Sequence, residues 1–232
     1  MTILRKLIIV FAITFIAMLV LGGLSIRALD NAQTRFDYVV SNSLPSISKL
    51  SEAVQHREEA RRQILMSLLV TDEAVFTKHM AQAKDELNKT RQIFDEYQAN
   101  LVSDKIDGQL LKKTRDIFDD YVQKTEAMSD TYHNQGIEAA RLMVSDGGVT
   151  ANASVALSAG LKEMLAHNYS IAKEYAENNH TQYINTFWLL VGTIVFLVAL
   201  VAVFATVILR YLSKGLKSLQ ESMGLISRSL DL

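Results

Sequence analysis

Two stretches without a charged residue decide how this chain is organised: LIIVFAITFIAMLVLGGLSI at residues 7–26 and FWLLVGTIVFLVALVAVFATVIL at residues 187–209. At a rise of about 1.5 Å per residue, a helix of either length crosses a hydrocarbon core of about 30 Å. The sequence between them is polar and rich in charge. We therefore predict that the chain crosses a membrane, folds outside it and returns.

Basic residues flank both stretches on the side of the chain termini. Arg5 and Lys6 precede the first stretch, and Arg210, Lys214 and Lys217 follow the second. Because Lys and Arg favour the cytoplasmic side of a membrane, this pattern predicts that both termini are cytoplasmic. The intervening segment is then external.

The first stretch also has one feature of a cleaved secretory signal, since a short basic segment opens it. Its apolar run is longer than the usual signal core, however, and Arg27 and Asp30 follow in what reads as continuing helix, without a small-residue cleavage site. An uncleaved membrane anchor is therefore the favoured interpretation.

Aromatic residues stand near both ends of the second stretch. Trp188 and Tyr211 occupy places where amphipathic rings anchor helices at the membrane interface, although either ring is equally suited to pack on a neighbouring helix. The predicted segments are a cytoplasmic end at 1–6, a transmembrane helix at 7–26, an external domain at 27–183, a second transmembrane helix at 184–210, and a linker with a further helix at 211–232.

Composition restricts the class of protein. The net charge is −1 and the excess of basic residues lies at the membrane flanks, so nothing indicates a nucleic-acid partner. The sequence has no cysteine, which excludes disulfides and thiol chemistry. With one proline and ten glycines in 232 residues, long helices meet few breaks.

Apolar residues recur at alternating spacings of three and four in four runs, which predicts four helices. Breaks at 71–72, 103–104 and 146–148 separate the runs, and the last run continues into the second apolar stretch. Such spacing favours packing at about +20°, so we predict an all-α fold: an antiparallel four-helix bundle whose first and fourth helices continue through the membrane. The main positions are Phe36, Val39 or Val40, Leu44, Ile47, Leu50, Val54, Ile64, Leu65 and Leu68; Phe76, Met80, Ala83, Leu87, Thr90, Phe94, Tyr97 and Leu101; Leu110, Thr114, Ile117, Tyr121, Met128 and Tyr132; and Val155, Leu161, Met164, Leu165, Ile171 and Tyr175.

Pro45 interrupts the first run. A proline inside a helix removes a backbone donor, so two outcomes are open: a kinked helix, or a break after which Ser43 caps a new helix.

Three arginines break the apolar pattern of the first helix. Continuing its spacing from Val54 leads to Arg57 and Arg61, and Arg62 stands beside them. A buried charge is costly unless it is paired, and the simple explanation is surface pairing of Arg61 and Arg62 with Glu58. The functional interpretation is an anion site, because guanidinium groups match carboxylate geometry. At about 100° per residue the three side chains spread too widely for one bundle to aim them all at one ligand, so a site between two subunits is favoured.

In this layout and in the segment QHREEARRQ at residues 55–63, the chain resembles the N-terminal part of a bacterial methyl-accepting chemotaxis protein with a four-helix-bundle sensor domain. The resemblance implies an inner-membrane receptor with a periplasmic sensor, in which first-helix arginines bind an amino-acid carboxylate across a homodimer interface. Arg57 and Arg62 match arginines of that pattern, and Arg61 matches a polar ligand-contacting position. A third family arginine falls at Met66, a departure that suggests a ligand other than aspartate or serine.

The resemblance also implies that the start of the fourth helix closes the site. Thr150 is the nearest match by spacing for a threonine that grips the ligand amine, with Asn152 and Ser154 as further candidates. The alternative is that Thr150 caps the helix after the Gly-Gly turn.

The end of the chain resembles the first helix of a HAMP signal relay, with an apolar stripe and the closing sequence SLDL at residues 229–232. Gly215 stands where that helix usually begins with proline. The stripe consists of Leu216, Leu219, Met223, Ile226 and Leu230.

Enzymatic signatures are missing from the sequence. It has no phosphate-cradling glycine loop, no nucleophile elbow and no zinc-binding HExxH helix, and its five histidines are scattered without ligand spacing. We expect no enzymatic activity, no cofactor and no metal.

The sequence thus predicts the input half of a homodimeric transmembrane chemoreceptor that binds a small carboxylate, contacts lipid, and acts on a downstream kinase and adaptor. Two alternatives stay open: the same sensor on a histidine kinase or a cyclase receptor, and a receptor or accessory membrane protein that docks a periplasmic binding protein.

Overall fold

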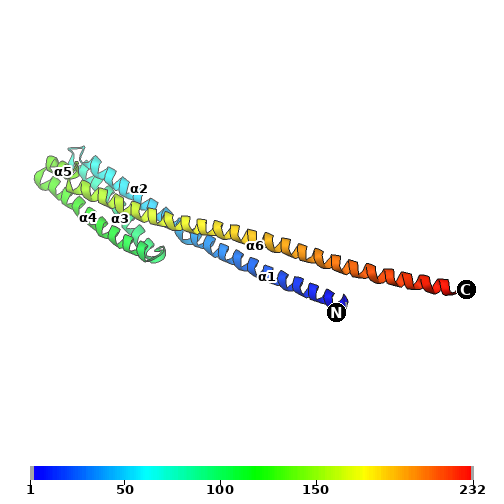
Figure 1. Ribbon diagram of the computed structural model, residues 1–232. Helices are drawn as coiled ribbons and strands as arrows, with labels where there is room; N and C mark the ends of the chain where they lie inside the picture. Colours follow the sequence, from blue (N-terminus) through cyan, green and yellow to red (C-terminus); the bar gives the residue numbers. More distant parts are fainter. Residues whose placement is uncertain (1–2, 231–232) are drawn as a thin grey trace. The chain divides into compact units, whose positions relative to one another are not determined.

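The structure, a computed structural model, describes the backbone of residues 3–230 and the side chains of residue 5 and of 7–217 and 220–223. Every regular element in this part of the chain is a helix (Figure 1). The elements are α1 (Ile3–Tyr38), the π-helix η1 (Val39–Ser43), α2 (Leu44–Ser67), α3 (Glu73–Asn100), α4 (Lys105–Gln135), α5 (Ile137–Val144) and α6 (Val149–Leu230).

The chain forms two compact units. One unit, from Thr34 to Glu177, is the bundle, in which α2, α3, α4 and the first part of α6 lie side by side (Figure 1). The other unit consists of the residues up to Gln33 and those from Asn178 on, and it holds both apolar stretches. The all-α four-helix-bundle prediction is confirmed.

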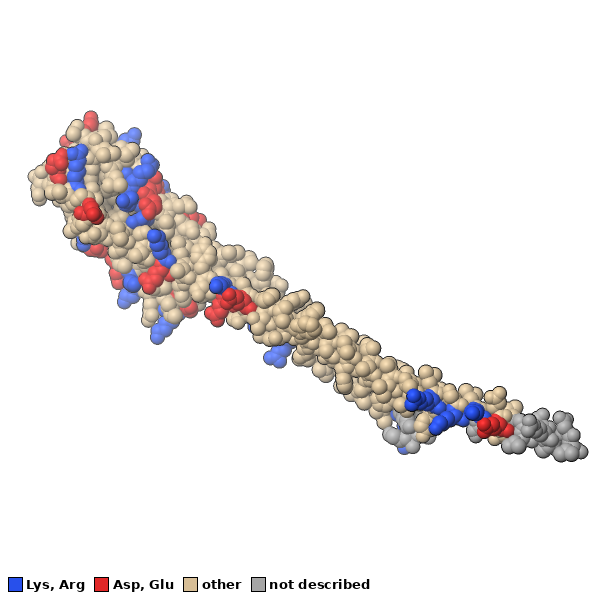
Figure 2. Space-filling view, turned by 45° about the horizontal axis from the view of Figure 1, so that its top comes forward, with Lys and Arg blue, Asp and Glu red and all other residues tan. Residues whose placement is uncertain are grey.

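Both apolar stretches lie on helices that are long and apolar enough to span a membrane. Their apolar side chains are mainly exposed, and Figure 2 shows this part of the surface almost uniformly tan, whereas basic and acidic groups alternate over the bundle. Exposed apolar surface of this extent suits a lipid environment. Trp188 and Tyr211 are both exposed, as an interfacial anchor requires, and Trp188 meets the ring of Phe187 edge-on with centroids 5.6 Å apart. Their anchoring role stays a prediction.

The predicted helix starts at two of the three breaks are built as expected. The carboxylate of Asp72 accepts hydrogen bonds from the backbone amides of Ala74 and Val75 at 2.8 and 3.1 Å, and Asp104 caps α4 through the amide of Asp107 at 2.8 Å. These bonds satisfy amides that a helix start otherwise leaves without partners.

The sequence did not predict the break between α4 and α5. α4 ends at Gly136, whose φ of 87° lies in the left-handed region that favours glycine, and the short helix α5 follows before the predicted break at residues 146–148. The single glycine is a weak signal, because a glycine inside an otherwise helical pattern is tolerated.

The helix break that was one of the two outcomes predicted for Pro45 is not observed. The chain stays helical from α1 into α2, and the five-residue π-helix η1 precedes Pro45, which lies in the first turn of α2. A wider turn accommodates a proline that supplies no backbone donor. Ser43 makes no capping bond; its hydroxyl is buried without a partner among the described residues, so the predicted cap is wrong.

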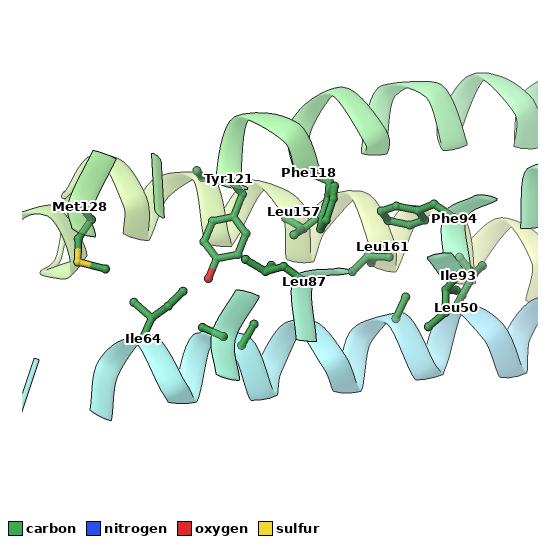
Figure 3. Packing of buried hydrophobic residues seen from close by; sticks show 14 of the residues in the cluster. Leu50, Ile64, Leu87, Ile93, Phe94, Phe118, Tyr121, Met128, Leu157 and Leu161 are labelled. Atoms are coloured by element: carbon green, nitrogen blue, oxygen red, sulfur yellow. The ribbon is translucent and has the colours of Figure 1, made fainter. Parts of the chain in front are cut away.

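The core runs along the bundle axis (Figure 3). Phe94 and Phe118 meet edge-to-face with ring centroids 5.5 Å apart, and near the turn between α2 and α3 the ring of Phe76 stacks on Tyr132 at 3.6 Å. The close-up shows side chains from all four helices converging. They include Leu50, Ile64, Leu87, Phe94, Phe118, Tyr121, Met128, Leu157 and Leu161.

In the last two predicted stripes, three positions were wrong by one or two residues, and in the first stripe Phe36 and Leu44 are exposed. Leu111 and Phe118 are buried where Leu110 and Ile117 were expected, and Val155 is 68% exposed while Leu157 is fully buried. Adjacent residues are similarly apolar at these places, so spacing alone does not choose between them.

α4 and α6 approach closely at Gly160. A β-carbon placed there would lie 2.9 Å from Oγ1 and 3.2 Å from Cγ2 of Thr114, nearer than van der Waals contact allows. The absence of a side chain at this point is what lets the two helices pack.

A buried polar network joins α3, α4 and α6 at the end of the bundle where α3 turns into α4. The Tyr97 hydroxyl donates to the fully buried carboxylate of Asp107 at 2.8 and 2.9 Å, and Ser103 donates to the same carboxylate from its amide and hydroxyl. Asn168 on α6 donates to the Tyr97 oxygen at 2.8 Å. Burial, and then the charge of Asp107, raise the pKa of Tyr97. Buried polar groups are costly unless bonded, so this network fixes how the three helices meet.

Acid pH is expected to weaken the same end of the bundle through Asp104. Burial opposes its ionisation, but hydrogen bonds from the Asp107 amide and from His167 outweigh burial and hold the pKa of Asp104 below its ordinary value of 3.8. A carboxyl group whose pKa is lower in the folded state stabilises the fold above its unfolded pKa and loses that effect as pH falls through the folded pKa. The variant Asp104→Asn keeps a capping side chain but does not titrate. Between about pH 5 and pH 2, its melting temperature should fall less than that of the parent chain; equal falls would contradict this.

Candidate functional site

A cavity of about 300 Å³ opens in the bundle where α2, α4 and the start of α6 meet. Its wall combines one cation, one carboxylate, three hydroxyl groups and apolar side chains. The lining residues are Arg61, Ile64, Leu65, Tyr121, Val144, Asp146, Thr150, Ala151, Ser154 and Val155.

Arg61 supplies the positive charge of this cavity. Its side chain is exposed, and within the described part of the chain it has no carboxylate within ion-pair distance. Glu58, the predicted partner, instead contacts Arg57. Arg61 is therefore available to an anion from outside the bundle.

Arg57 is buried on the apolar face of α2, as its spacing predicted, but it does not line the cavity. One terminal nitrogen donates to the backbone oxygen and to the hydroxyl of Ser154 on α6, at 2.5 and 2.8 Å. The other terminal nitrogen pairs with Glu58. Arg57 thus lies behind the cavity wall.

Arg62 does not line the cavity and forms a two-pronged pair with Glu59, with 2.8 Å from Nε to one carboxylate oxygen. Hydrogen bonds from Arg62 and then from Gln63 lower the pKa of Glu59 to about 2. Both partners are solvent-accessible, so the pair adds little to stability. Within one bundle the structure gives Arg62 an ordinary surface role.

Thr150 lines the cavity and is buried, and its hydroxyl donates to the backbone oxygen of Lys124 on α4 at 3.2 Å. Asn152 is exposed, donates to the backbone oxygen of Gly147, and does not line the cavity. The structure therefore brings Arg61 and Thr150 together, with Arg57 behind them, and separates Arg62 and Asn152.

Sequence reasoning missed two cavity residues. Tyr121, a core position in the predicted stripe, also lines the cavity; burial raises its pKa, while Ser154, Arg57 and Arg61 oppose that rise. Asp146 was read only as part of a helix break. Nothing in the sequence indicated that Asp146 lines the same cavity as Arg61, because this depends on how α5 packs in the bundle.

A larger groove of about 740 Å³ lies between α3 and α4, away from the arginines of α2. It is lined by two basic residues, Lys84 and Arg91, and Arg91 pairs with Asp119 at 3.1 Å and lies 5.2 Å from the ring centroid of Phe118. We take the smaller cavity as the candidate site because it combines Arg61 with residues of α6, whereas the larger groove is lined by α3 and α4.

A helical bundle joined to two helices of membrane-spanning length, with a polar cavity between its helices, defines a class of membrane-receptor sensor. A family model described as a four helix bundle sensory module for signal transduction matches residues 1–183, and the chain belongs to this family, the sensor domain of methyl-accepting chemotaxis proteins. The search of curated proteins found no match to the chain.

Proposed function

We propose that this chain is the input half of a transmembrane chemoreceptor, and that the cavity beside Arg61 binds a small zwitterionic carboxylate such as an amino acid. The observation that carries the proposal is the placement of Arg61 and Asp146 on one cavity wall. A guanidinium matches a carboxylate, and a carboxylate matches an ammonium group. The hydroxyls of Thr150, Ser154 and Tyr121 supply further polar contacts.

The cavity is connected to the membrane through one element. Thr150 and Ser154 lie near the start of α6, and the same uninterrupted helix carries the apolar stretch at 187–209. The proposed external orientation of the bundle rests on the basic residues that flank both stretches. A ligand acts on α6 only to the extent that it binds two states of the receptor differently, by typically 1–3 kcal/mol.

The experiment that tests this function is a thermal-shift screen of the chain in detergent, followed by circular dichroism, against amino acids and simple organic acids. A ligand at 100 times its Kd stabilises the folded form by about 2.7 kcal/mol. Amino acids should raise the melting temperature more than the matching acids without an amino group. The absence of any shift would favour indirect sensing through a binding protein.

A homodimer through the first helices is part of the proposal, because apolar side chains on this edge lack a cover in the single chain. Phe36, Val40 and Leu44 recur at a spacing of four and are each about half exposed or more. Single cysteines at these positions in the membrane-bound chain should crosslink between subunits faster than cysteines at Asp37 and Ser41, one residue further round the helix. Equal rates at all five positions would contradict this interface.

The output of the receptor is the remaining part of the proposal. The family match ends at residue 183, and the side chains of Leu219, Ile226 and Leu230 in the HAMP-like stripe, like Asp231 and Leu232, lie outside the described residues. A glutamate-rich cytoplasmic hairpin downstream of residue 232 would support chemotaxis. A helix with a phosphorylatable histidine and an ATP-binding domain would instead indicate a sensor kinase.

A further inference from the structure

The groove between α3 and α4 plays no part in the function proposed above. Its volume of about 740 Å³ lies within the range of small-molecule sites. The two helices touch on either side of it along the bundle. On one side Arg91 pairs with Asp119 at 3.1 Å, and on the other the ring of Phe76 stacks on Tyr132 with centroids 3.6 Å apart. Between these two contacts the helices leave the groove open.

Small side chains keep the groove open. Because α3 and α4 run antiparallel, counting ten residues along each helix from the pair of Arg91 with Asp119 brings Ala81 level with Ser129. Both residues line the groove, as does Thr125. Closely packed interiors fill such space with longer side chains, so a small residue on each helix at one level leaves room for a guest.

The buried and half-buried part of the groove lining is mainly apolar. Leu87 and Phe118 belong to the hydrophobic core (Figure 3), and Met80 and Val122 pack against it. These side chains offer a surface on which an apolar group of a ligand loses contact with water.

The exposed edges of the groove carry opposite charges. Lys84 lies on the α3 edge, and Glu126 and Asp130 lie on the α4 edge; none of the three forms an ion pair within the described residues. Counting seven residues from the pair of Arg91 with Asp119 brings Lys84 level with Glu126. The groove thus separates an ammonium group from two carboxylates, and a ligand that carries both charges meets both edges at once.

The spacing of these charges favours a dipeptide over a single amino acid. Asp130 lies four residues beyond the level of Lys84, an offset of about 6 Å along the helices. An extended dipeptide spans about 7 Å, whereas an amino acid carries both charged groups on one carbon. The Asn88 amide and the Ser129 hydroxyl line the same stretch, make no hydrogen bond within the described residues, and suit the polar atoms of a peptide group.

We propose that the groove between α3 and α4 is a second binding site, and that it takes a dipeptide with an apolar C-terminal side chain. The terminal ammonium lies at Glu126 and Asp130, the carboxylate lies at Lys84, and the apolar side chain rests on Leu87 and Val122. This site shares no lining residue with the cavity proposed for amino acids.

Isothermal titration of the full chain in detergent with the dipeptide alanyl-leucine tests the proposal. Saturable binding is expected. N-acetyl-alanyl-leucine lacks the ammonium and alanyl-leucinamide lacks the carboxylate, so each should bind at least about tenfold more weakly. Absence of saturable binding by alanyl-leucine at millimolar concentrations, or equal affinity for all three peptides, would overturn the proposal.

Two variants locate the site. Lys84→Gln and Asp130→Asn should each raise the Kd for alanyl-leucine by about tenfold or more. Lys78→Gln and Asp116→Asn are the matched controls, because these residues are exposed on the same two helices but do not line the groove. All four positions are exposed, so the variants should keep the helical circular dichroism of the parent chain. An equal Kd in all four would overturn the assignment.

Arg61→Gln separates this site from the proposed function. It alters only the other cavity, so the Kd for alanyl-leucine should stay at the parent value, whereas Ala81→Leu, which fills the groove from an exposed position, should abolish binding. Loss of alanyl-leucine binding in Arg61→Gln, with parent-like binding in Ala81→Leu, would move the dipeptide to the other cavity and overturn the second site. A failed amino-acid screen leaves these results unchanged.

Discussion

Leu161→Ala is expected to lower the free energy of unfolding of the bundle by about 2–5 kcal/mol. Leu161 lies on α6 in the centre of the core, where it is completely buried and close to Phe94 (Figure 3). Truncation removes apolar contacts and leaves a cavity that a closely packed interior fills only in part. Thermal unfolding of the chain in detergent, followed by circular dichroism at 222 nm, measures the effect.

The matched control is Leu69→Ala. Leu69 is the same residue type but is 72% exposed in the turn after α2, so its truncation should change the free energy of unfolding by less than about 0.5 kcal/mol. Similar losses in both variants would show that the core does not pack as described.

Arg61→Gln is expected to weaken binding of the amino acid found in the screen by about 1.5–3 kcal/mol, or roughly 10- to 150-fold in Kd. Arg61 is the cation on the cavity wall, and without it a bound carboxylate loses its charged partner. Isothermal titration of the chain in detergent measures the change. The melting temperature without ligand should stay near that of the parent chain, because Arg61 makes no ion pair in the described part of the chain.

The variant Arg62→Gln tests whether one bundle forms the whole binding site. Arg62→Gln should leave Kd unchanged if one bundle forms the whole site, since Arg62 is occupied by Glu59 at the surface. If a partner subunit contributes Arg62, as the family resemblance implies, this variant should weaken binding as well. An unchanged Kd in Arg61→Gln would remove the cavity from consideration as a carboxylate site.

Much of the fold was determined by the sequence alone. Two uncharged stretches long enough to cross a bilayer have few other uses, and alternation of three and four apolar positions is a property of helices only. Asp72 and Asp104 marked two helix starts because their short carboxylates bond the free amides of a first turn. These signals depend only on nearby residues, so they predict helices and helix starts without knowledge of what each segment packs against.

The candidate site was predicted in part. Arg57 and Arg61 were singled out because charge on an apolar seam is unusual, and both prove to lie at or behind one cavity. The sequence does not predict their roles, because helical spacing gives the direction of a side chain but not the acceptor that it meets. Ser154, 97 residues further along the chain, and Glu58 both bond Arg57, and because Glu58 contacts Arg57, Arg61 is left available.

Tertiary structure decided the rest. It chose Leu111 and Phe118 over their apolar neighbours, since close packing depends on the shapes of the facing helices and not on hydrophobicity alone. It brought Asp146 to the cavity through the fold of α5, and it joined Tyr97, Asp107 and Asn168 into one buried network. The sequence by itself determined which segments are helices and which of them are fit for a membrane, because these depend on periodicity and length. Which polar side chains meet was decided only when the helices packed, because buried polar groups find partners across long sequence separations.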